Sequence, residues 1–206
     1  MKQPDPPASR PTSFKVRPDI LTVSGEYFDF IDFAPNNVLI EDIAHALSNI
    51  CRFAGHTREF YSVAQHSVLV SQIVPPEHAM AGLLHDAPEA YLGDVTTPLK
   101  QLLPDYKALE KRIEADVLTK LGLPTVLPPE IKEADIIAMA TEQRDLMAPH
   151  DDTWILTAGI VPLAVRIDPV MPSEAKRLFL NRYFELLGAG KAALAARADQ
   201  VRLASL

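Results

Sequence analysis

Hydrophobic residues recur every three to four positions over most of the chain beyond residue 40, the spacing of amphipathic helices that pack on a common core. The pattern predicts helices over residues 40–50, 58–74, 77–92, 104–121, 129–147 and 173–187, with a weaker, alanine-rich helix from about 190 to 204. Prolines at 76, 104 and 129 stand where a first helical turn tolerates them, and glycines at 93, 122 and 188 stand where helices stop. We therefore expect an all-α fold.

Three segments depart from the helical pattern. Residues 20–33, ILTVSGEYFDFIDF, alternate β-branched and aromatic residues around Ser24 and Gly25, which predicts a short β-hairpin packed on the bundle. Residues 148–172 contain Trp154 and four prolines and are expected to form a long irregular connection. Residues 1–18 hold five prolines and indicate an extended or disordered tail. The expected organisation is a tail over 1–18, a helical bundle with its small hairpin over 19–188, and a C-terminal helical extension over 189–206.

Composition limits the kind of protein that can carry this pattern. A chain of 206 residues with 48% hydrophobic content suits one compact domain, and its single cysteine excludes an intramolecular disulfide. The first 20 residues lack the apolar segment of a secretory signal, and no run reaches the roughly 18 apolar residues of a membrane span. We expect a cytoplasmic protein without a membrane partner. The net charge of −7 gives no footprint for a nucleic acid polymer, so a small-molecule substrate is expected.

The strongest chemical signal is a histidine and an aspartate inside an apolar stretch. His85 and Asp86 stand side by side in AMAGLLHDAPEAYLGD, and polar groups there need a partner that offsets the loss of water. His66 and Asp135 also lie on apolar helix faces. Taken alone, a lone histidine is more often a hydrogen-bonded core residue, and a lone aspartate can cap a neighbouring helix. The four residues together predict a bound metal ion.

The ligand types restrict the choice of ion. Two imidazoles and two carboxylates suit Mn²⁺, Co²⁺, Fe²⁺, Ni²⁺ or Zn²⁺, and the absence of thiolates argues against a structural zinc site. No histidine occurs between Asp86 and Asp135, so that segment does not supply the ligands of a second ion. We expect one divalent ion per site.

Two further carboxylates follow the histidine–aspartate pair. On a continuing helix, Glu89 would lie one turn beyond His85 on the same face. Pro88 removes a helical N–H, which should kink or tighten the helix and turn Glu89 and Asp94 toward a cleft. A divalent ion lowers the pKa of a bound water, and a nearby carboxylate can then handle protons. The alternative is a solvated Glu89 and an Asp94 that caps the turn at Gly93.

These motifs resemble those of the HD-domain metal-dependent phosphohydrolases. The HD-x-x-E-x-x-x-G-D run at 85–94, followed by Thr-Pro-Leu-Lys at 97–100, is similar to the bacterial 5′-deoxynucleotidase branch, and residues 47–67, LSNICRFAGHTREFYSVAQHS, resemble a prophage-encoded HD subgroup. The resemblance spans roughly residues 20–187. It implies an HD-domain helical bundle, one divalent ion held by His66, His85, Asp86 and Asp135, and hydrolysis of a nucleotide phosphate ester. It also implies catalytic roles for Glu89 and Asp94.

The resemblance further implies that an arginine–aromatic pair before the first ligand histidine contacts substrate, here Arg52 and Phe53. The Arg52 guanidinium could bind two phosphate oxygens, whereas a surface arginine is the alternative. Phe53 departs from the tryptophan of the deoxynucleotidase pattern, and its distance to the histidine differs by one residue. His56 and Gln65 are weaker candidate substrate contacts. We expect Lys100 to be an exposed lysine at a helix start, and the histidines at 45, 78 and 150 to be structural or solvent-facing.

The expected function is hydrolysis of (deoxy)nucleoside 5′-monophosphates by metal-activated water. A nucleoside triphosphate or alarmone hydrolase would share the metal site but need more cationic residues. A regulatory module that binds metal and nucleotide without turnover would show a ligand-induced thermal shift and no phosphate release. A purely structural metal site would show tight metal retention and no effect of nucleotides. The resemblance also implies a possible homodimer, to which the 189–206 extension could contribute.

Overall fold

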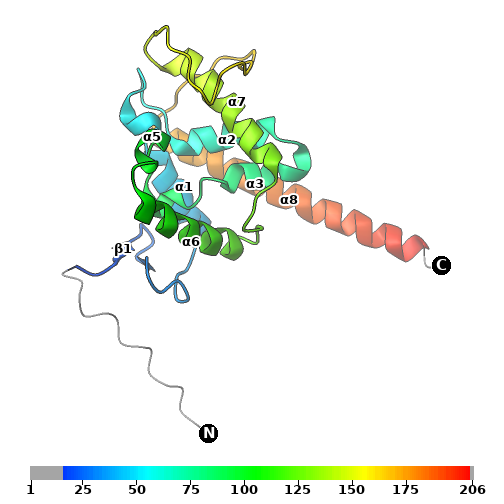
Figure 1. The fold of residues 1–206 in the computed structure, drawn as a ribbon. Coiled ribbons are helices and arrows are strands. Elements are labelled where there is room, and N and C mark those ends of the chain that lie inside the picture. Colours follow the sequence, from blue (N-terminus) through cyan, green and yellow to red (C-terminus); the bar gives the residue numbers. More distant parts are fainter. Residues whose placement is uncertain (1–15, 205–206) are drawn as a thin grey trace.

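The computed structural model describes the backbone of residues 16–204 and the side chains of residues 16–190. The described chain is mainly helical with one small sheet, as the hydrophobic pattern predicts (Figure 1). Two short 3₁₀ helices, η1 and η2, accompany the α-helices. The elements are η1 (Arg52–Gly55), η2 (Pro76–His78), α1 (Ile40–Asn49), α2 (Val63–Ile73), α3 (Ala79–Leu84), α4 (Glu89–Leu92), α5 (Thr97–Lys100), α6 (Pro104–Lys120), α7 (Pro129–Leu146) and α8 (Pro172–Ala204).

The predicted hairpin is confirmed. Strands β1 (Asp19–Leu21) and β2 (Tyr27–Asp29) pair antiparallel, and Gly25 adopts a φ of 89° in the connecting turn, where a side chain would be strained. Phe28 is 1% exposed and stacks on Tyr91 with ring centroids 3.9 Å apart. The hairpin is thereby fastened to the bundle.

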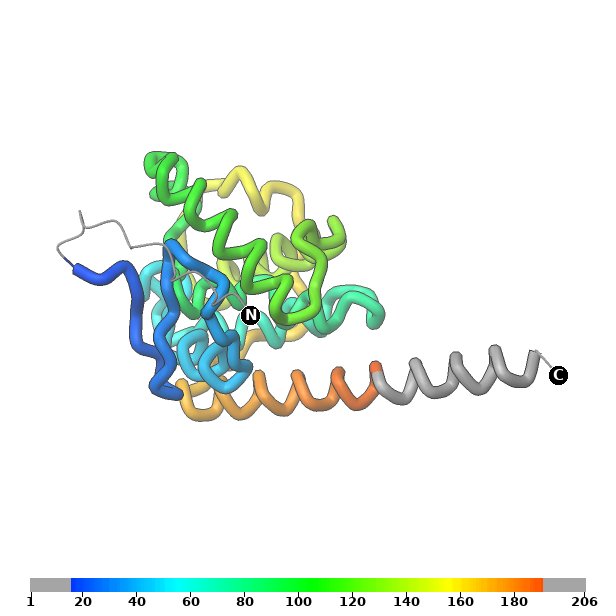
Figure 2. The backbone as a smooth tube through the Cα atoms, turned by 90° about the horizontal axis from the view of Figure 1, so that it is seen from below, coloured from blue at the N-terminus to red at the C-terminus, as the bar shows by residue number. Residues whose placement is uncertain are grey.

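Helix α2 lies at the centre of the bundle. It contacts α1, α3, α7 and α8, and α8 also packs against α1 and α3 along one side of the molecule (Figure 2). The main core is formed by buried side chains from the hairpin and from α1, α2, α3, α6 and α8, including Phe28, Ile43, Leu47, Val63, Leu83, Ile113, Val117 and Phe179. Because α2 is surrounded on several sides, a polar residue on its inner face is removed from solvent.

Local chemistry explains where two predicted helices begin or break. Helix α2 begins at Val63, later than the predicted 58, because the Ser62 hydroxyl caps it by accepting a bond from the Gln65 backbone N–H at 3.2 Å. The helix predicted over 77–92 is interrupted after Leu84. Pro88 has no N–H to give to the Leu84 carbonyl, which instead accepts from Ala87 at 3.0 Å in a tight turn. The kink expected from Pro88 is thus confirmed.

The glycine stop signals are partly wrong. Gly93 ends α4 at φ 78° and Gly122 follows α6 at φ 76°, both in the left-handed region that favours glycine. Gly188 does not end a helix, because α8 continues through it to Ala204, so the predicted boundary between a 173–187 helix and a separate 190–204 helix is wrong. Glycine weakens a helix without necessarily ending it.

The long connection between α7 and α8 has no regular secondary structure over residues 148–171, as predicted. The tail predicted over 1–18 lies mostly outside the described residues. Among the helices of the described chain, none combines the length and apolarity that crossing a lipid bilayer demands.

Candidate metal centre

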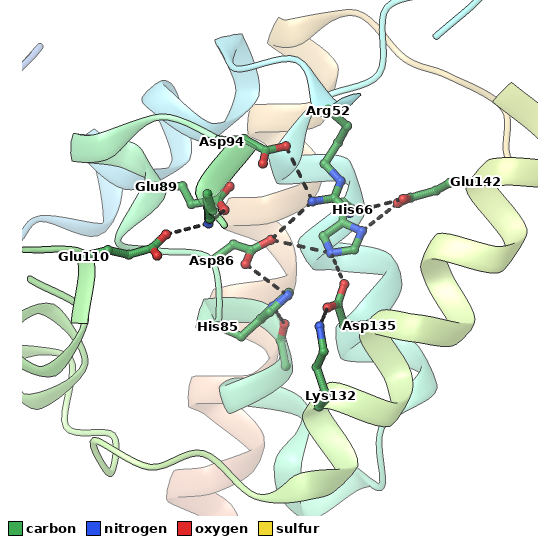
Figure 3. A network of polar contacts seen from close by, with 12 residues as sticks. Arg52, His66, His85, Asp86, Glu89, Asp94, Glu110, Lys132, Asp135 and Glu142 are labelled. Atoms are coloured by element: carbon green, nitrogen blue, oxygen red, sulfur yellow. Dashed lines mark hydrogen bonds and ion pairs between the residues drawn. The ribbon is translucent and has the colours of Figure 1, made fainter. Parts of the chain in front are cut away.

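Two helices and one turn bring the predicted metal ligands together (Figure 3). His66 comes from α2, His85 and Asp86 from the turn after α3, and Asp135 from α7. Ligand atoms of His66, His85 and Asp135 all lie within 4.8 Å of one another. The carboxylate of Asp86 lies against both rings, 3.5 Å from Nε2 of His66 and 3.3 Å from Nε2 of His85. The group of His66, His85 and Asp135 can hold a metal ion, with Asp86 beside it.

The two histidines are oriented as metal-binding histidines usually are. Nδ1 of His85 lies 2.9 Å from the Gly82 carbonyl, and Nδ1 of His66 lies 2.6 Å from Oε1 of Glu142. When each Nδ1–H donates to such an acceptor, Nε2 carries the free lone pair. Nε2 of both rings is buried and has no hydrogen-bond partner. Two orphaned ring nitrogens that face two carboxylates fit a cation between them.

Without an ion, the carboxylates of the site stabilise a positive charge on the neighbouring imidazole. Burial and Arg52 act to lower the pKa of His66, but Glu142 and Asp135 outweigh them and raise that pKa to about 10. Burial acts to raise the pKa of Asp135, yet protonated His66, whose Nε2 lies 3.3 Å from Oδ1 of Asp135, holds that pKa well below its usual range. A buried imidazole therefore keeps a proton that its carboxylate neighbours stabilise, and a dication would supply that charge instead.

Glu142 is a residue of the candidate site that the sequence analysis missed. It is fully buried on α7, and its second oxygen accepts from Nη2 of Arg52 at 3.3 Å while the first holds His66. Burial acts to raise its pKa, but His66 and Arg52 hold it at about 2. Glu142 follows Asp135 by seven residues, two helical turns, so its position on the face of a predicted ligand was the available signal.

Arg52 lies at the junction of these groups. Its side chain is 10% exposed, and its guanidinium nitrogens lie 3.6 Å from Asp94, 4.0 Å from Asp86 and 3.3 Å from Glu142, measured to a carboxylate oxygen. Burial acts to lower its pKa, but the carboxylates of Glu142, Asp86 and Asp94 raise it well above the usual value. Arg52 is therefore a buried, permanently charged residue beside the candidate ligands, and the alternative of a surface arginine is wrong.

Glu89 and Asp94 both reach the site. Glu89 is 9% exposed, and its Oε2 has no hydrogen-bond partner, so the alternative of a solvated Glu89 is wrong. Burial raises the pKa of Glu89 well above its usual value, and the charges of Asp86 and Asp94 add to this. Burial likewise raises the pKa of Asp94, although Arg52 opposes the shift.

Lys100 differs from the expectation of an exposed lysine. It lies at the end of α5, its side chain is 20% exposed, and its Nζ is 2.5 Å from Glu110 and 3.9 Å from Glu89. The short helix α5, which the hydrophobic pattern did not predict, turns it inward. The histidines at 45 and 78 are half-buried and His150 is exposed, and none of the three belongs to the metal group.

A cavity of about 700 Å³ opens beside the metal group. Asp86, Glu89, Asp94 and Asp135 line it with the cations of Arg52, Lys100 and Lys132. A second part of its lining is apolar and comes from η1, α7 and the connection after α7: Phe53, Met139, Met147, Trp154, Ile155 and Leu156. The volume lies within the range of small-molecule sites.

The weaker candidate substrate contacts divide into two groups. Phe53 and His56 line the cavity. Gln65 does not: its amide donates to the Asp168 carbonyl at 2.7 Å and accepts from the Val170 backbone N–H at 3.0 Å. Because both ends of the Gln65 amide hold the connection before α8, the structure assigns it a structural position rather than a substrate contact.

Fold and site together define a mainly helical protein with a histidine–aspartate group able to hold a metal ion. No family model matches the chain. It is 46% identical over 168 residues to the uncharacterized protein YfdR of Escherichia coli K12, an alignment that covers 81% of this chain and 94% of YfdR. It is 36% identical over 188 residues to an uncharacterized protein of Rhodobacter capsulatus, covering 80% of this chain and 93% of the relative. The chain belongs to the same protein family as these two proteins, whose names state no activity.

Proposed function

We propose that this protein is a metal-dependent phosphohydrolase of the HD-domain type that hydrolyses (deoxy)nucleoside 5′-monophosphates. One observation carries the proposal. Two histidines with buried Nε2 atoms that make no hydrogen bond lie beside Asp86 and Asp135, and these two carboxylates line a cavity of about 700 Å³ together with the buried Arg52. A metal group beside a guanidinium is what a phosphate ester needs for binding and cleavage.

His66, His85, Asp86 and Asp135 would hold one divalent ion, for which two imidazoles and two carboxylates are suitable donors. When bound, such an ion polarises a phosphoryl oxygen and lowers the pKa of water so that hydroxide is available near neutral pH. Glu142 and the Gly82 carbonyl keep the two imidazoles in the tautomer that binds metal.

Arg52 is the proposed phosphate-binding residue. Glu142 fixes one guanidinium nitrogen at 3.3 Å, and the other nitrogen faces Asp94 at 3.6 Å and Asp86 at 4.0 Å, distances too long for strong hydrogen bonds. That nitrogen can therefore donate to a phosphate oxygen without losing a tight partner. The charge developing on the phosphoryl oxygens during cleavage would be stabilised in this buried setting.

Glu89 and Asp94 are the proposed proton-handling carboxylates. The raised pKa of Glu89, caused by burial and by Asp86 and Asp94, lets it hold a proton that it can donate to the departing 5′ oxygen. Asp94 lies 3.6 Å from Arg52 and lines the cavity, where it can orient the attacking water and accept a proton from it.

The charge around the cavity favours a monophosphate over a triphosphate. Among the described residues that line it, three cations face four carboxylates, and a divalent ion would leave the lining with a small positive excess. Two of the cations already have close carboxylate partners, Lys100 with Glu110 and Lys132 with Asp135 at 2.8 Å. That excess suits a phosphate dianion and falls short of the charge on a triphosphate.

The test is phosphate release by metal-stripped protein given Mn²⁺ or Co²⁺, with deoxy- and ribonucleoside 5′-monophosphates, triphosphates and an alarmone as substrates. We expect release from monophosphates only, and loss of both metal binding and turnover in Asp86→Ala. Asp105→Ala, a change of an exposed aspartate on α6, is the matched control. Circular dichroism, and Asp86→Asn as a second variant, separate misfolding from loss of the site. Release from triphosphates alone would refute the monophosphate assignment. A nucleotide-induced thermal shift without any release would refute enzymatic function.

A further inference from the structure

The cavity has two chemically different parts, and the proposed phosphate chemistry uses only one of them. The charged part holds Arg52 and the carboxylates, whereas the apolar part is lined by two aromatic rings, two methionines and two aliphatic residues. A bare phosphate or a sugar phosphate has no group that would desolvate the apolar part. A flat, weakly polar group attached to the phosphate through a sugar would do so.

The aromatic rings continue directly from the phosphate-binding arginine. The Phe53 ring centroid lies 5.4 Å from Cζ of Arg52, and the Trp154 ring centroid lies 5.8 Å from that of Phe53, tilted by 47°. Rings at this tilt are not packed face to face, so neither ring fully covers the face of the other. Arginine, phenylalanine and tryptophan thus follow one another along the cavity, with the guanidinium at the phosphate-binding end.

An unusual backbone places Phe53 beside Arg52. Phe53 and Ala54 have φ values of 53° and 52°, a strained region that non-glycine residues rarely adopt. Surrounding bonds hold the segment, including Arg52 N–H to the Tyr61 carbonyl at 2.9 Å and His56 N–H to the Phe53 carbonyl at 3.0 Å. Such strain is characteristic of functional segments.

Trp154 is held in place from behind, although it belongs to an irregular connection. The His150 ring stacks on the Trp154 ring with centroids 5.6 Å apart, and the Trp154 carbonyl accepts a hydrogen bond from the Thr157 backbone N–H at 3.1 Å. The Thr157 hydroxyl donates to Gln143 on α7 at 2.6 Å, which ties this turn to the bundle. An aromatic ring fixed before the ligand arrives loses little conformational entropy on binding.

From these observations we propose that Trp154, with Phe53, forms a stacking subsite for the base of the nucleotide. The inference rests on the proposed function and adds the group that the substrate carries beyond its sugar. Within the apolar part of the lining, the indole N–H of Trp154 is the one strong side-chain donor and no side chain is a strong acceptor, so little there would read a base edge by hydrogen bonds. The subsite therefore tolerates all bases and favours purines, whose larger rings stack over more area.

Trp154 is the single tryptophan of the chain, so intrinsic fluorescence reports on this residue alone. The first test is titration of metal-stripped protein with AMP and, separately, with ribose 5-phosphate, excited where adenine does not absorb. We expect saturable quenching by AMP and none by ribose 5-phosphate. Equal responses to the two ligands, or no response to AMP, would overturn the subsite. Because no turnover is needed, this result stands or falls independently of the proposed catalysis.

The second test compares turnover of AMP and of ribose 5-phosphate by Trp154→Ala with Mn²⁺ present. We expect KM for AMP to rise about 10-fold or more, the loss typical of removing one base–aromatic stack, with kcat nearly unchanged. Turnover of ribose 5-phosphate should not change, and Trp154→Phe should restore most of the affinity for AMP. Val161→Ala, in the same connection, 81% exposed and outside the cavity lining, is the control and should behave as wild type. Equal losses with both substrates would show that Trp154 only seals the cavity and would overturn the proposal.

Discussion

Replacement of Glu142 by glutamine tests whether one buried carboxylate orients both the metal-binding His66 and the phosphate-binding Arg52. Glu142 is fully buried and bonds Nδ1 of His66 at 2.6 Å and Nη2 of Arg52 at 3.3 Å. Glutamine keeps the volume and one acceptor oxygen but removes the charge. Loss of a residue that orients a metal-binding histidine lowers metal affinity by about 10- to 100-fold. This corresponds to about 1.4–2.8 kcal/mol, at about 1.4 kcal/mol per factor of ten.

The same change should also lower stability. A hydrogen bond to a charged group contributes about 1.5–3 kcal/mol, and for a chain of this size each kcal/mol shifts Tm by about 2–4 °C. We therefore expect metal-free Glu142→Gln to melt several degrees below the metal-free wild type. Since a ligand stabilises the folded state in proportion to the logarithm of its concentration over Kd, the gain in Tm on adding Mn²⁺ should be smaller in the variant.

The assay is titration calorimetry of Mn²⁺ or Zn²⁺ into metal-stripped protein, alongside melting curves at several metal concentrations. Glu133→Gln, a change of an exposed glutamate on the same helix, is the matched control and should match the wild type in both. If Glu142→Gln bound metal within twofold of the wild type, the assignment of Glu142 as the residue that orients His66 would be refuted, whatever its stability.

Three further changes test the scaffold around the site. Asp145→Asn should lower the unfolding free energy by about 2 kcal/mol at neutral pH, because the nearly buried Asp145 carboxylate accepts bonds from Arg144 at 2.7 Å and from the Ile167 backbone N–H at 2.9 Å. Hydrogen bonding from Arg144 lowers the pKa of Asp145 below its usual 3.8, so this contribution to stability is present above about pH 4 and is lost as the pH falls further. Urea unfolding at several pH values should therefore show that the difference in unfolding free energy between wild type and Asp145→Asn becomes smaller in acid. A difference that stays constant with pH would contradict this cause. Gly82→Ala should cost about 1–3 kcal/mol, because its Cβ would lie 3.2 Å from the Ser71 Cα across the α2–α3 contact, and unchanged stability would show that the helices can separate freely. Ser62→Ala should cost about 1 kcal/mol by removing the cap of α2, again by urea unfolding, and a stability equal to the wild type would show that the cap is replaced by solvent.

Much of the metal group was predictable from the sequence because it follows helical periodicity. His66 and Asp135 stand on apolar helix faces from which water is excluded, and a polar side chain there needs a partner that compensates for its lost hydration. His85 and Asp86 stand in an apolar stretch, and the proline two residues later predicted the break beside them. The hairpin was predictable for the same reason, since alternation and a glycine turn are local signals.

The rest depends on contacts between distant segments. Glu142 stands in the polar run TEQRD, where nothing local marks it as buried. Only its spacing of seven residues from Asp135, which places both on one helix face, indicated that it faces the core. Trp154 lies in a connection without periodicity, and its place beside Phe53 follows from packing across about a hundred residues of chain. At Gly188 the sequence misled, because a glycine within α8 does not need the positive φ that ends α4 and α6.

The most direct test of the central claim is the rate of phosphate release from dAMP as Mn²⁺ is titrated into metal-stripped protein. We expect no release without metal and a rise to a plateau that is reached at one bound ion per chain. Release that persists in excess chelator would contradict metal-dependent hydrolysis. A plateau that needed two ions per chain would contradict the single site formed by His66, His85, Asp86 and Asp135.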